Sequence, residues 1–293
     1  MPIQEHLEAY IASLRSDGRA EVYITRQESR IQKISSLAGF TALADIELTE
    51  VQQTINNMRT GKDKRPFSAT TRKHWIQAIK GFTSWLTRSS QRLPADPLVA
   101  LKRPSGKRDR RLVRRALLVE EWQIMKALLP TVGTNRGIEA QERLLVYELA
   151  IQTGLRASEI HSLQRANLQL TGENPTVVVP SDITKDARDA NQPVTAVFAA
   201  KLRDHVATRT LSGPVFKMPR LDAMARMIRE DVEAISRIWF MDLENNESKQ
   251  ELLSKYPSFL KVCDERDQRI DFHALRHTCG AWLALSGVHA KTI

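Results

Sequence analysis

The fold is decided by two stretches of sequence, Thr-Gly-Leu-Arg-Ala-Ser-Glu-Ile at residues 153–160 and Phe-His-Ala-Leu-Arg-His-Thr at residues 272–278. In the first, Gly154 is suited to end one helix. Arg156 then opens the next helix, whose free backbone N–H groups favour an anion. In the second, His273 and Arg276 are three residues apart and share one face of a helix. Either stretch alone is weak evidence for a functional site, because an arginine after a helix-ending glycine is commonly an ordinary surface residue.

The sequence around these stretches is mostly helical. Apolar residues recur every three or four positions through the first 92 residues, and the clearest predicted helix there is 68–86. After residue 115, the pattern predicts helices at 119–129, 139–152, 199–209, 221–235 and 274–285, strands at 176–180 and 193–197, and a polar loop at 242–250. The predicted fold class is therefore mainly α with a small antiparallel β-sheet in the second domain.

Positive charge is concentrated in one short segment. The 293 residues include 44 Lys and Arg against 34 Asp and Glu, a formal net charge of +10. Residues 102–115 hold eight of these basic residues and one acidic residue. Fully extended, this segment would reach roughly 48 Å, more than the width of a DNA duplex. We interpret it as a linker that contacts the phosphates of double-stranded DNA; the alternative is a solvated linker or a patch for an acidic protein.

The composition excludes several classes of protein. Hydrophobic residues at 42% and charged residues at 27% are typical of a globular chain. No apolar run is long enough to span a membrane, and the N-terminus lacks a signal pattern. Cys263 and Cys279 are too few for a disulfide scaffold. We expect a cytoplasmic protein without a membrane partner, a small-molecule substrate, a metal or a cofactor.

Taken in order, the two stretches resemble the arginine boxes of the tyrosine recombinase family, the phage-type integrases. The resemblance covers most of the chain and implies a two-domain architecture. It assigns residues 1–92 to a helical core-binding domain, 93–115 to a basic interdomain linker, and 116–293 to an α+β catalytic domain. The implied function is site-specific DNA recombination or integration, in which the family breaks and rejoins strands through a 3′-phosphotyrosine.

The resemblance also implies roles for individual residues. Arg156 and Arg276 match the arginines that grip the scissile phosphate, Lys185 matches the lysine that protonates the leaving 5′ oxygen, and His273 matches a histidine that assists proton transfer. Arg188 lies in the same turn as Lys185 and could be confused with it. We expect Glu159 to support the site and Thr278 to bond the backbone. The expected DNA-binding residues are Arg72, Lys73, Lys80, Lys107, Arg108, Arg110, Arg111, Arg114 and Arg115.

No tyrosine occupies the position of the family's nucleophile. The four tyrosines, Tyr10, Tyr23, Tyr147 and Tyr256, all precede His273. The expectation is a catalytic domain that is incomplete at its C-terminus and binds duplex DNA without cleaving it. The chain would then be part of a longer reading frame or a remnant in a mobile element. The family works as a tetramer on paired sites, so a homo-oligomer on DNA is a further expectation.

Three other interpretations remain open. His273 and His277 have the spacing of a helical zinc site, although the intervening residues lack the glutamate of His-Glu-x-x-His and Arg276 would repel a cation. The chain could be a non-catalytic DNA-binding regulator or a competitor at recombination sites. It could also be a helical module that binds an acidic protein.

Overall fold

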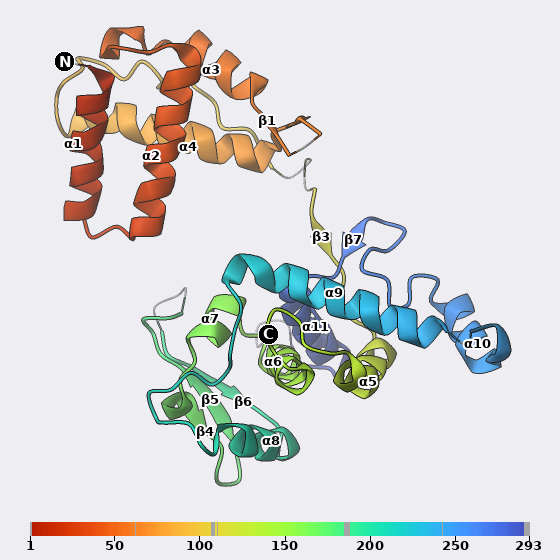
Figure 1. Cartoon of the computed structure of the whole chain (residues 1–293). Helices are drawn as coiled ribbons and strands as arrows, with labels where there is room; N and C mark the ends of the chain where they lie inside the picture. The colour runs from red at the N-terminus through yellow and green to blue at the C-terminus, as the bar shows by residue number, and fades with distance from the viewer. Residues whose placement is uncertain are drawn as a thin grey trace. The chain divides into compact units, whose positions relative to one another are not determined.

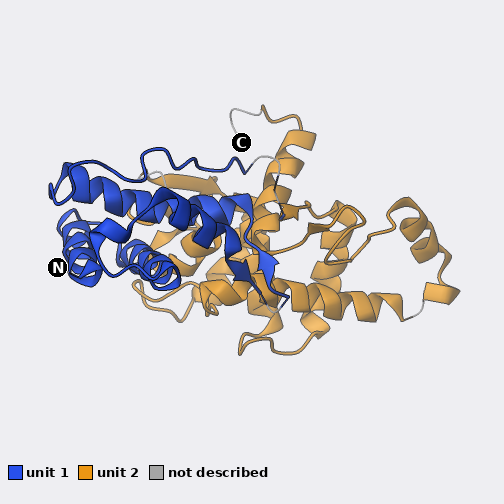
Figure 2. Ribbon diagram, turned by 90° about the horizontal axis from the view of Figure 1, so that it is seen from above, with its two compact units in different colours: residues 1–111 blue, residues 112–293 orange. Residues whose placement is uncertain are grey.

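A computed structural model describes residues 2–61, 63–106, 109, 111–184, 188–241 and 243–289. The chain divides into two compact units, residues 1–111 and 112–293 (Figures 1 and 2). Each unit has its own hydrophobic core. None of the helices in the described part of the chain combines the length and the hydropathy that a membrane span needs.

The first unit is a bundle of helices with one short hairpin. Helices α1 and α2 form an antiparallel pair that packs against α4, and α3 packs against both α2 and α4 (Figure 1). The bounds are α1 Ile3–Ser16, α2 Glu21–Ala38, η1 Leu43–Asp45, α3 Leu48–Asn57, β1 Arg59–Thr60, β2 Arg65–Pro66 and α4 Ala69–Arg88.

Helix α4 forms where its apolar stripe predicts it. The Ser68 side chain accepts a hydrogen bond from the Thr71 amide and caps the N-terminus. Ile79, Phe82 and Leu86 are fully buried along one face. The prediction of this helix is confirmed, and its apolar face holds the bundle together.

The second unit is built around two helices that carry the two stretches of sequence. Helix α6 packs along α11, and α5 and α9 complete the helical layer, while a three-stranded antiparallel sheet, β4–β5–β6, lies beside α8 (Figure 1). The bounds are β3 Val113–Arg114, α5 Val119–Leu128, η2 Leu129–Thr131, α6 Ala140–Thr153, α7 Ala157–Ser162, η3 Arg165–Asn167, β4 Leu168–Gln169, β5 Thr176–Val179, β6 Ala190–Pro193, α8 Ala196–Val206, α9 Leu221–Phe240, η4 Leu243–Asn245, α10 Glu247–Lys255, β7 Gln268–Arg269 and α11 Phe272–Leu285.

Two elements of this unit differ from the prediction. Strand β6 begins at Ala190 and pairs with β5 from Val179↔Ala190 to Thr176↔Pro193, so the strand predicted at 193–197 lies too late in the sequence. The polar composition of 242–250 predicts a loop, yet α10 begins within this segment. The Asn246 side chain caps that helix by accepting from the Lys249 amide, and Leu252 and Leu253 pack on the core.

The basic segment is not a free linker. Asp109 accepts from the Ala69 amide at 2.6 Å, and the Arg111 guanidinium donates to the Pro66 carbonyl at 2.9 Å, so both residues belong to the first unit. Val113 and Arg114 form β3, which pairs in parallel with β7 of the second unit. Among the described residues of this segment, 109 and 111 therefore bond within the first unit, and 113 and 114 bond within the second.

Candidate phosphate-binding site

Arg156 is positioned by a sharp change of direction between α6 and α7. Gly154 ends α6 with φ +65°, and Arg156 is the N-cap residue of α7. Glu159, buried in the first turn of α7, accepts from the Arg156 amide and from its Nη1, both at 2.7 Å. Glu159 thus holds the guanidinium in place, as expected for a supporting residue. The Arg156 side chain remains 32% exposed, so it can reach a ligand.

Arg276 is brought to the same place by α11. Its Nη1 donates to the Gly154 carbonyl at 2.5 Å, and Cys279, one turn further along α11, packs against Gly154. The two arginines are 120 positions apart in the chain. They meet because α6 and α11 pack closely where α6 ends.

Both arginines line one cleft of about 520 Å³. The rest of its wall comes from the end of α6, from α7 and from the β5–β6 hairpin. The lining residues are Thr153, Leu155, Arg156, Glu159, Thr184, Arg188, Asp189, Ala190, Gln192 and Arg276. Three arginines face two carboxylates, and one of those carboxylates is engaged by Arg156. An anion with several oxygens, such as a phosphodiester, suits this balance.

His273 lies on α11, one turn before Arg276, but it does not line the cleft. Its ring makes an edge contact with His277 at a centroid distance of 5.1 Å. Partial burial, followed by the charges of Arg114 and His277, lowers the pKa of His273 from its ordinary value. The imidazole is therefore mainly neutral at pH 7 and able to exchange a proton.

Helix α11 is anchored by residues that do not touch the cleft. The Asp271 side chain accepts from the Ala274 amide at 3.0 Å, and both of its oxygens accept from Arg114 Nε at 2.8 Å. The Thr278 hydroxyl accepts from the Leu117 amide and donates to the Ala274 carbonyl. Asp271 thus caps α11, and the expected backbone-bonding role of Thr278 is confirmed.

Arg114 and Arg115, two of the predicted DNA-binding residues, each pair with a carboxylate of the second unit. Arg114 pairs with Asp271, and Arg115, 11% exposed, donates to both oxygens of the buried Glu121 at 2.7 Å. Arg115 also donates to the Lys261 carbonyl. Because each charge is matched by a carboxylate, the structure gives these two arginines a role in holding the second unit together. Arg111 bonds Asp109 and the Pro66 carbonyl, yet stays exposed.

The predicted DNA-binding residues on α4 also differ from one another in their exposure and hydrogen bonds. Lys73 is exposed. Lys80 Nζ instead donates to the backbone carbonyls of Val99 and Leu101, at 2.9 and 3.0 Å, and so bonds α4 to the segment that follows it. Arg72 is half-buried, with Nη1 3.4 Å from the Asn56 side-chain oxygen. The expected site residues that lie outside the described part of the chain are Lys107, Arg108, Arg110 and Lys185.

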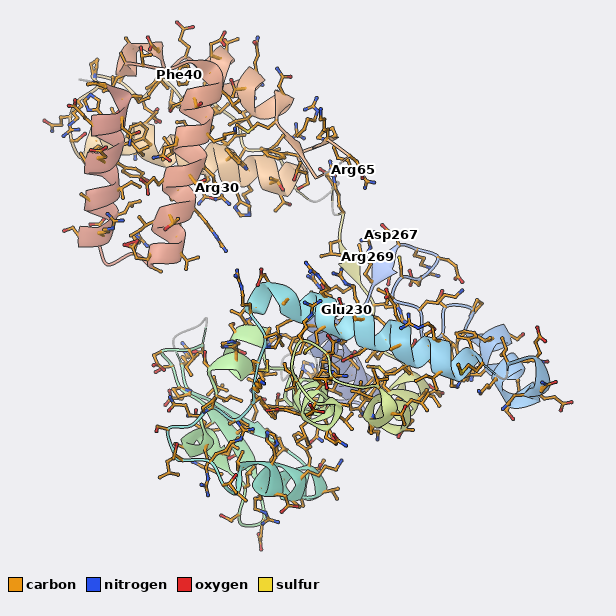
Figure 3. The ribbon with its side chains drawn as sticks, in the orientation of Figure 1. Arg30, Phe40, Arg65, Glu230, Asp267 and Arg269 are labelled. Carbon is orange, nitrogen blue, oxygen red and sulfur yellow. The ribbon has the colours of Figure 1, made fainter. Side chains whose placement is uncertain are left out.

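The first unit carries a basic hollow that the sequence analysis does not predict. Tyr23, Arg26 and Arg30 of α2 line a hollow of about 520 Å³ with His74 and Gln77 of α4. Neither arginine pairs with a carboxylate among the described residues, and burial, with Arg26 close by, lowers the pKa of Arg30. Arg30 lies midway along α2 (Figure 3). The available signal is their spacing of four, off the apolar stripe of Ile24 and Ile31.

The zinc site considered from the sequence has only two neighbouring candidate ligands among the described residues. His273 and His277 are neighbours, but no group of three or more His, Cys, Asp or Glu side chains suited to a metal occurs among the described residues. Both cysteines are free thiols.

Gly154 offers a test of the packing that joins the two arginines. A Cβ there would lie 3.3 Å from Cys279 Sγ, in addition to the strain of the positive φ. We expect Gly154→Ala to lower the free energy of unfolding of the second unit by about 1–3 kcal/mol more than Gly172→Ala. Gly172 has φ +94° and open space around it, so its replacement isolates the strain. Equal midpoints of urea denaturation for the two variants would contradict this.

The comparisons with known proteins agree with this geometry. A model of the phage integrase family matches residues 120–293, which include both arginines of the cleft. This chain belongs to the phage integrase family. The predicted membership of the tyrosine recombinases is thereby confirmed, and with it the family's activity in site-specific DNA recombination.

Solved structures show the same fold at low identity. The lambda integrase dimer bound to a COC′ core site has a TM-score of 0.67 at 13% identity, covering 98% of this integrase-family chain and 71% of its own. The lambda integrase tetramer bound to a Holliday junction has a TM-score of 0.66 at 14% identity, covering 100% and 75%. The XerH site-specific recombinase bound to difH substrate has a TM-score of 0.63 at 13% identity, covering 96% and 74%. The predicted fold class is confirmed. No curated protein sequence matches the chain significantly.

Proposed function

We propose that this integrase-family chain binds duplex DNA with its phosphate backbone held in the cleft of Arg156 and Arg276. The observation that carries the proposal is the meeting of these two guanidinium groups, from elements far apart in the chain, at one open cleft. A planar guanidinium donates two parallel hydrogen bonds to phosphate oxygens. Two such groups bind the non-bridging oxygens and stabilise charge that develops on them during strand transfer.

The other roles extend from this cleft. His273, neutral near pH 7, would assist proton transfer once DNA brings the phosphate toward α11. Lys185 would protonate the leaving 5′ oxygen, the role implied by its match to the lysine of the family. On the first unit, Arg26, Arg30 and Lys73 would contact phosphates of the same duplex, together with Lys107, Arg108, Arg110 and Arg111.

Assembly on DNA is part of the proposal. The lambda integrase structures that resemble this chain are a dimer and a tetramer on DNA, which supports a homo-oligomer on paired sites. The cytoplasm is the compartment that this function implies. No cofactor, metal or small-molecule substrate is needed for phosphate transfer through a protein nucleophile.

A second candidate function is that of a non-catalytic regulator that occupies recombination sites. One observation favours it: no tyrosine lines the cleft among the described residues. Both functions share DNA binding, and they differ in whether a tyrosine reaches the bound phosphate.

The DNA contact of the first unit is tested by Arg26→Ala/Arg30→Ala. We expect the double variant to weaken binding to a labelled duplex and to make the slope of log K against log salt shallower by about 0.9 for each phosphate that is no longer neutralised. The control is Arg88→Ala, an exposed arginine in the last turn of α4 that does not line the hollow, which should leave the slope unchanged. If the double variant bound DNA with the affinity and the salt slope of this control, the hollow would not be part of the DNA interface.

A further inference from the structure

We propose that Arg188 is a third phosphate-binding arginine of the cleft, and that Thr184 is the residue that positions it. The inference rests on the proposed function, since it assigns a DNA contact to the wall of the same cleft. Arg188 comes from the β5–β6 hairpin, whereas Arg156 and Arg276 come from α7 and α11. The cleft would therefore hold its phosphate from three separate elements.

The guanidinium groups of the three arginines differ in how many bonds they make within the protein. Arg156 pairs with Glu159, and Arg276 donates to the Gly154 carbonyl. Arg188 lines the cleft and is exposed, and no ion pair or side-chain hydrogen bond of its guanidinium is found among the described residues. A phosphate that binds the Arg188 guanidinium would therefore displace no hydrogen bond to another described residue.

The backbone of Arg188 is held, although its side chain is not. The Thr184 hydroxyl accepts from the Arg188 amide at 3.1 Å and donates to the Arg188 carbonyl at 2.8 Å. Next to it, the Asp189 side chain accepts from the Ser181 amide at 2.7 Å. These bonds tie the two sides of the hairpin together at the rim of the cleft. A fixed backbone lowers the entropy cost when the guanidinium closes on a phosphate.

Asp189 is engaged in a way that leaves Arg188 its charge. One oxygen of the carboxylate is used by the Ser181 amide, and no ion pair with Arg188 is formed between these two described residues. Of the two carboxylates in the cleft wall, the other, Glu159, is bound by Arg156. Among the described residues that line the cleft, Arg188 is thus the arginine with no carboxylate paired to its guanidinium and no hydrogen bond from it to another described residue, and removal of its charge should weaken DNA binding directly.

The test uses binding of the 293-residue chain to a labelled duplex, followed by fluorescence anisotropy over a salt series. We expect Arg188→Ala to weaken binding roughly tenfold at low salt and to reduce the salt slope by about 0.9. Arg188→Lys should keep the slope, because the charge remains, yet bind less tightly, because the planar fork is absent. Arg237→Ala, an exposed arginine on α9 away from the cleft, is the matched control and should change neither quantity.

The positioning role is tested by a double-mutant cycle. Thr184→Val should weaken binding severalfold in the wild-type chain and have no further effect in the Arg188→Ala chain, because it acts through Arg188. Equal effects in both backgrounds would overturn that role. An Arg188→Ala chain that behaves like the Arg237→Ala control would overturn the phosphate contact. Failure of the wild-type chain itself to bind duplex DNA would instead overturn the proposed function.

Discussion

Replacing Glu121 with alanine is expected to lower the free energy of unfolding of the second unit by about 3–5 kcal/mol. Glu121 is fully buried, and its two oxygens accept four hydrogen bonds. Two come from the Arg115 guanidinium, one from the Leu118 amide and one from the Leu260 amide, all between 2.7 and 2.9 Å. Removal of the carboxylate leaves a largely buried cation and two amides without their acceptor.

The measurement is hydrogen exchange of peptides from residues 112–293 over a urea series, which follows the second unit separately. Glu120→Ala is the matched control, because Glu120 is the exposed neighbour in the same helix and should change stability by no more than about 0.5 kcal/mol. Equal protection in the two variants would contradict the view that the Arg115–Glu121 pair holds this unit. Peptides from residues 1–111 should be unaffected by either change.

A polypeptide of these 293 residues is expected to form no covalent adduct with a nicked suicide substrate, although it binds the duplex. The physical reason lies in its tyrosines. Tyr147 is fully buried and donates to Asp231 at 2.7 Å, and burial, with Asp231 beside it, raises the pKa of its hydroxyl well above the ordinary value. Tyr10 is buried in the first unit, and neither Tyr23 nor Tyr256 lines the cleft.

The assay needs a positive control with a nucleophile. Fusion of an integrase segment that carries a tyrosine should restore adduct formation, and Arg276→Ala in that fusion should abolish it, because the arginine acts mainly in the transition state. Adduct formation by the unfused 293-residue chain would contradict the prediction. It would then be necessary to identify which of the four tyrosines reaches the phosphate.

The two arginine boxes could be predicted because local sequence determines their geometry. Gly154 ends α6 and Asp271 caps α11, and both signals are visible without any tertiary contact. The direction of Arg156 and Arg276 into one cleft needs the packing of α6 on α11. Sequence spacing does not contain that information, so the boxes are recognisable whereas the membership of Arg188 in the same wall is not.

The basic segment at residues 102–115 shows what sequence cannot predict, namely the environment of each cation. A run of cations in sequence looks uniform, yet Arg111, Arg114 and Arg115 have three different environments. Their partners, Asp109, Asp271 and Glu121, are from two to 157 positions away. A charge count cannot tell a cation that is matched by a distant carboxylate from one that faces solvent. The same limit applies to Lys80, a predicted DNA-binding residue that donates to two backbone carbonyls, and to Arg26 and Arg30, whose shared hollow the sequence does not predict.

The central claim is that Arg156 and Arg276 together hold a DNA phosphate. It is tested most directly by the salt dependence of duplex binding for Arg156→Ala/Arg276→Ala against the control Arg226→Ala/Arg237→Ala, two exposed arginines of α9. We expect the wild-type chain and the control to bind alike, and the cleft variant to bind more weakly with a slope shallower by about 0.9, as one phosphate is no longer neutralised. A cleft variant with the affinity and the slope of the control would contradict the claim.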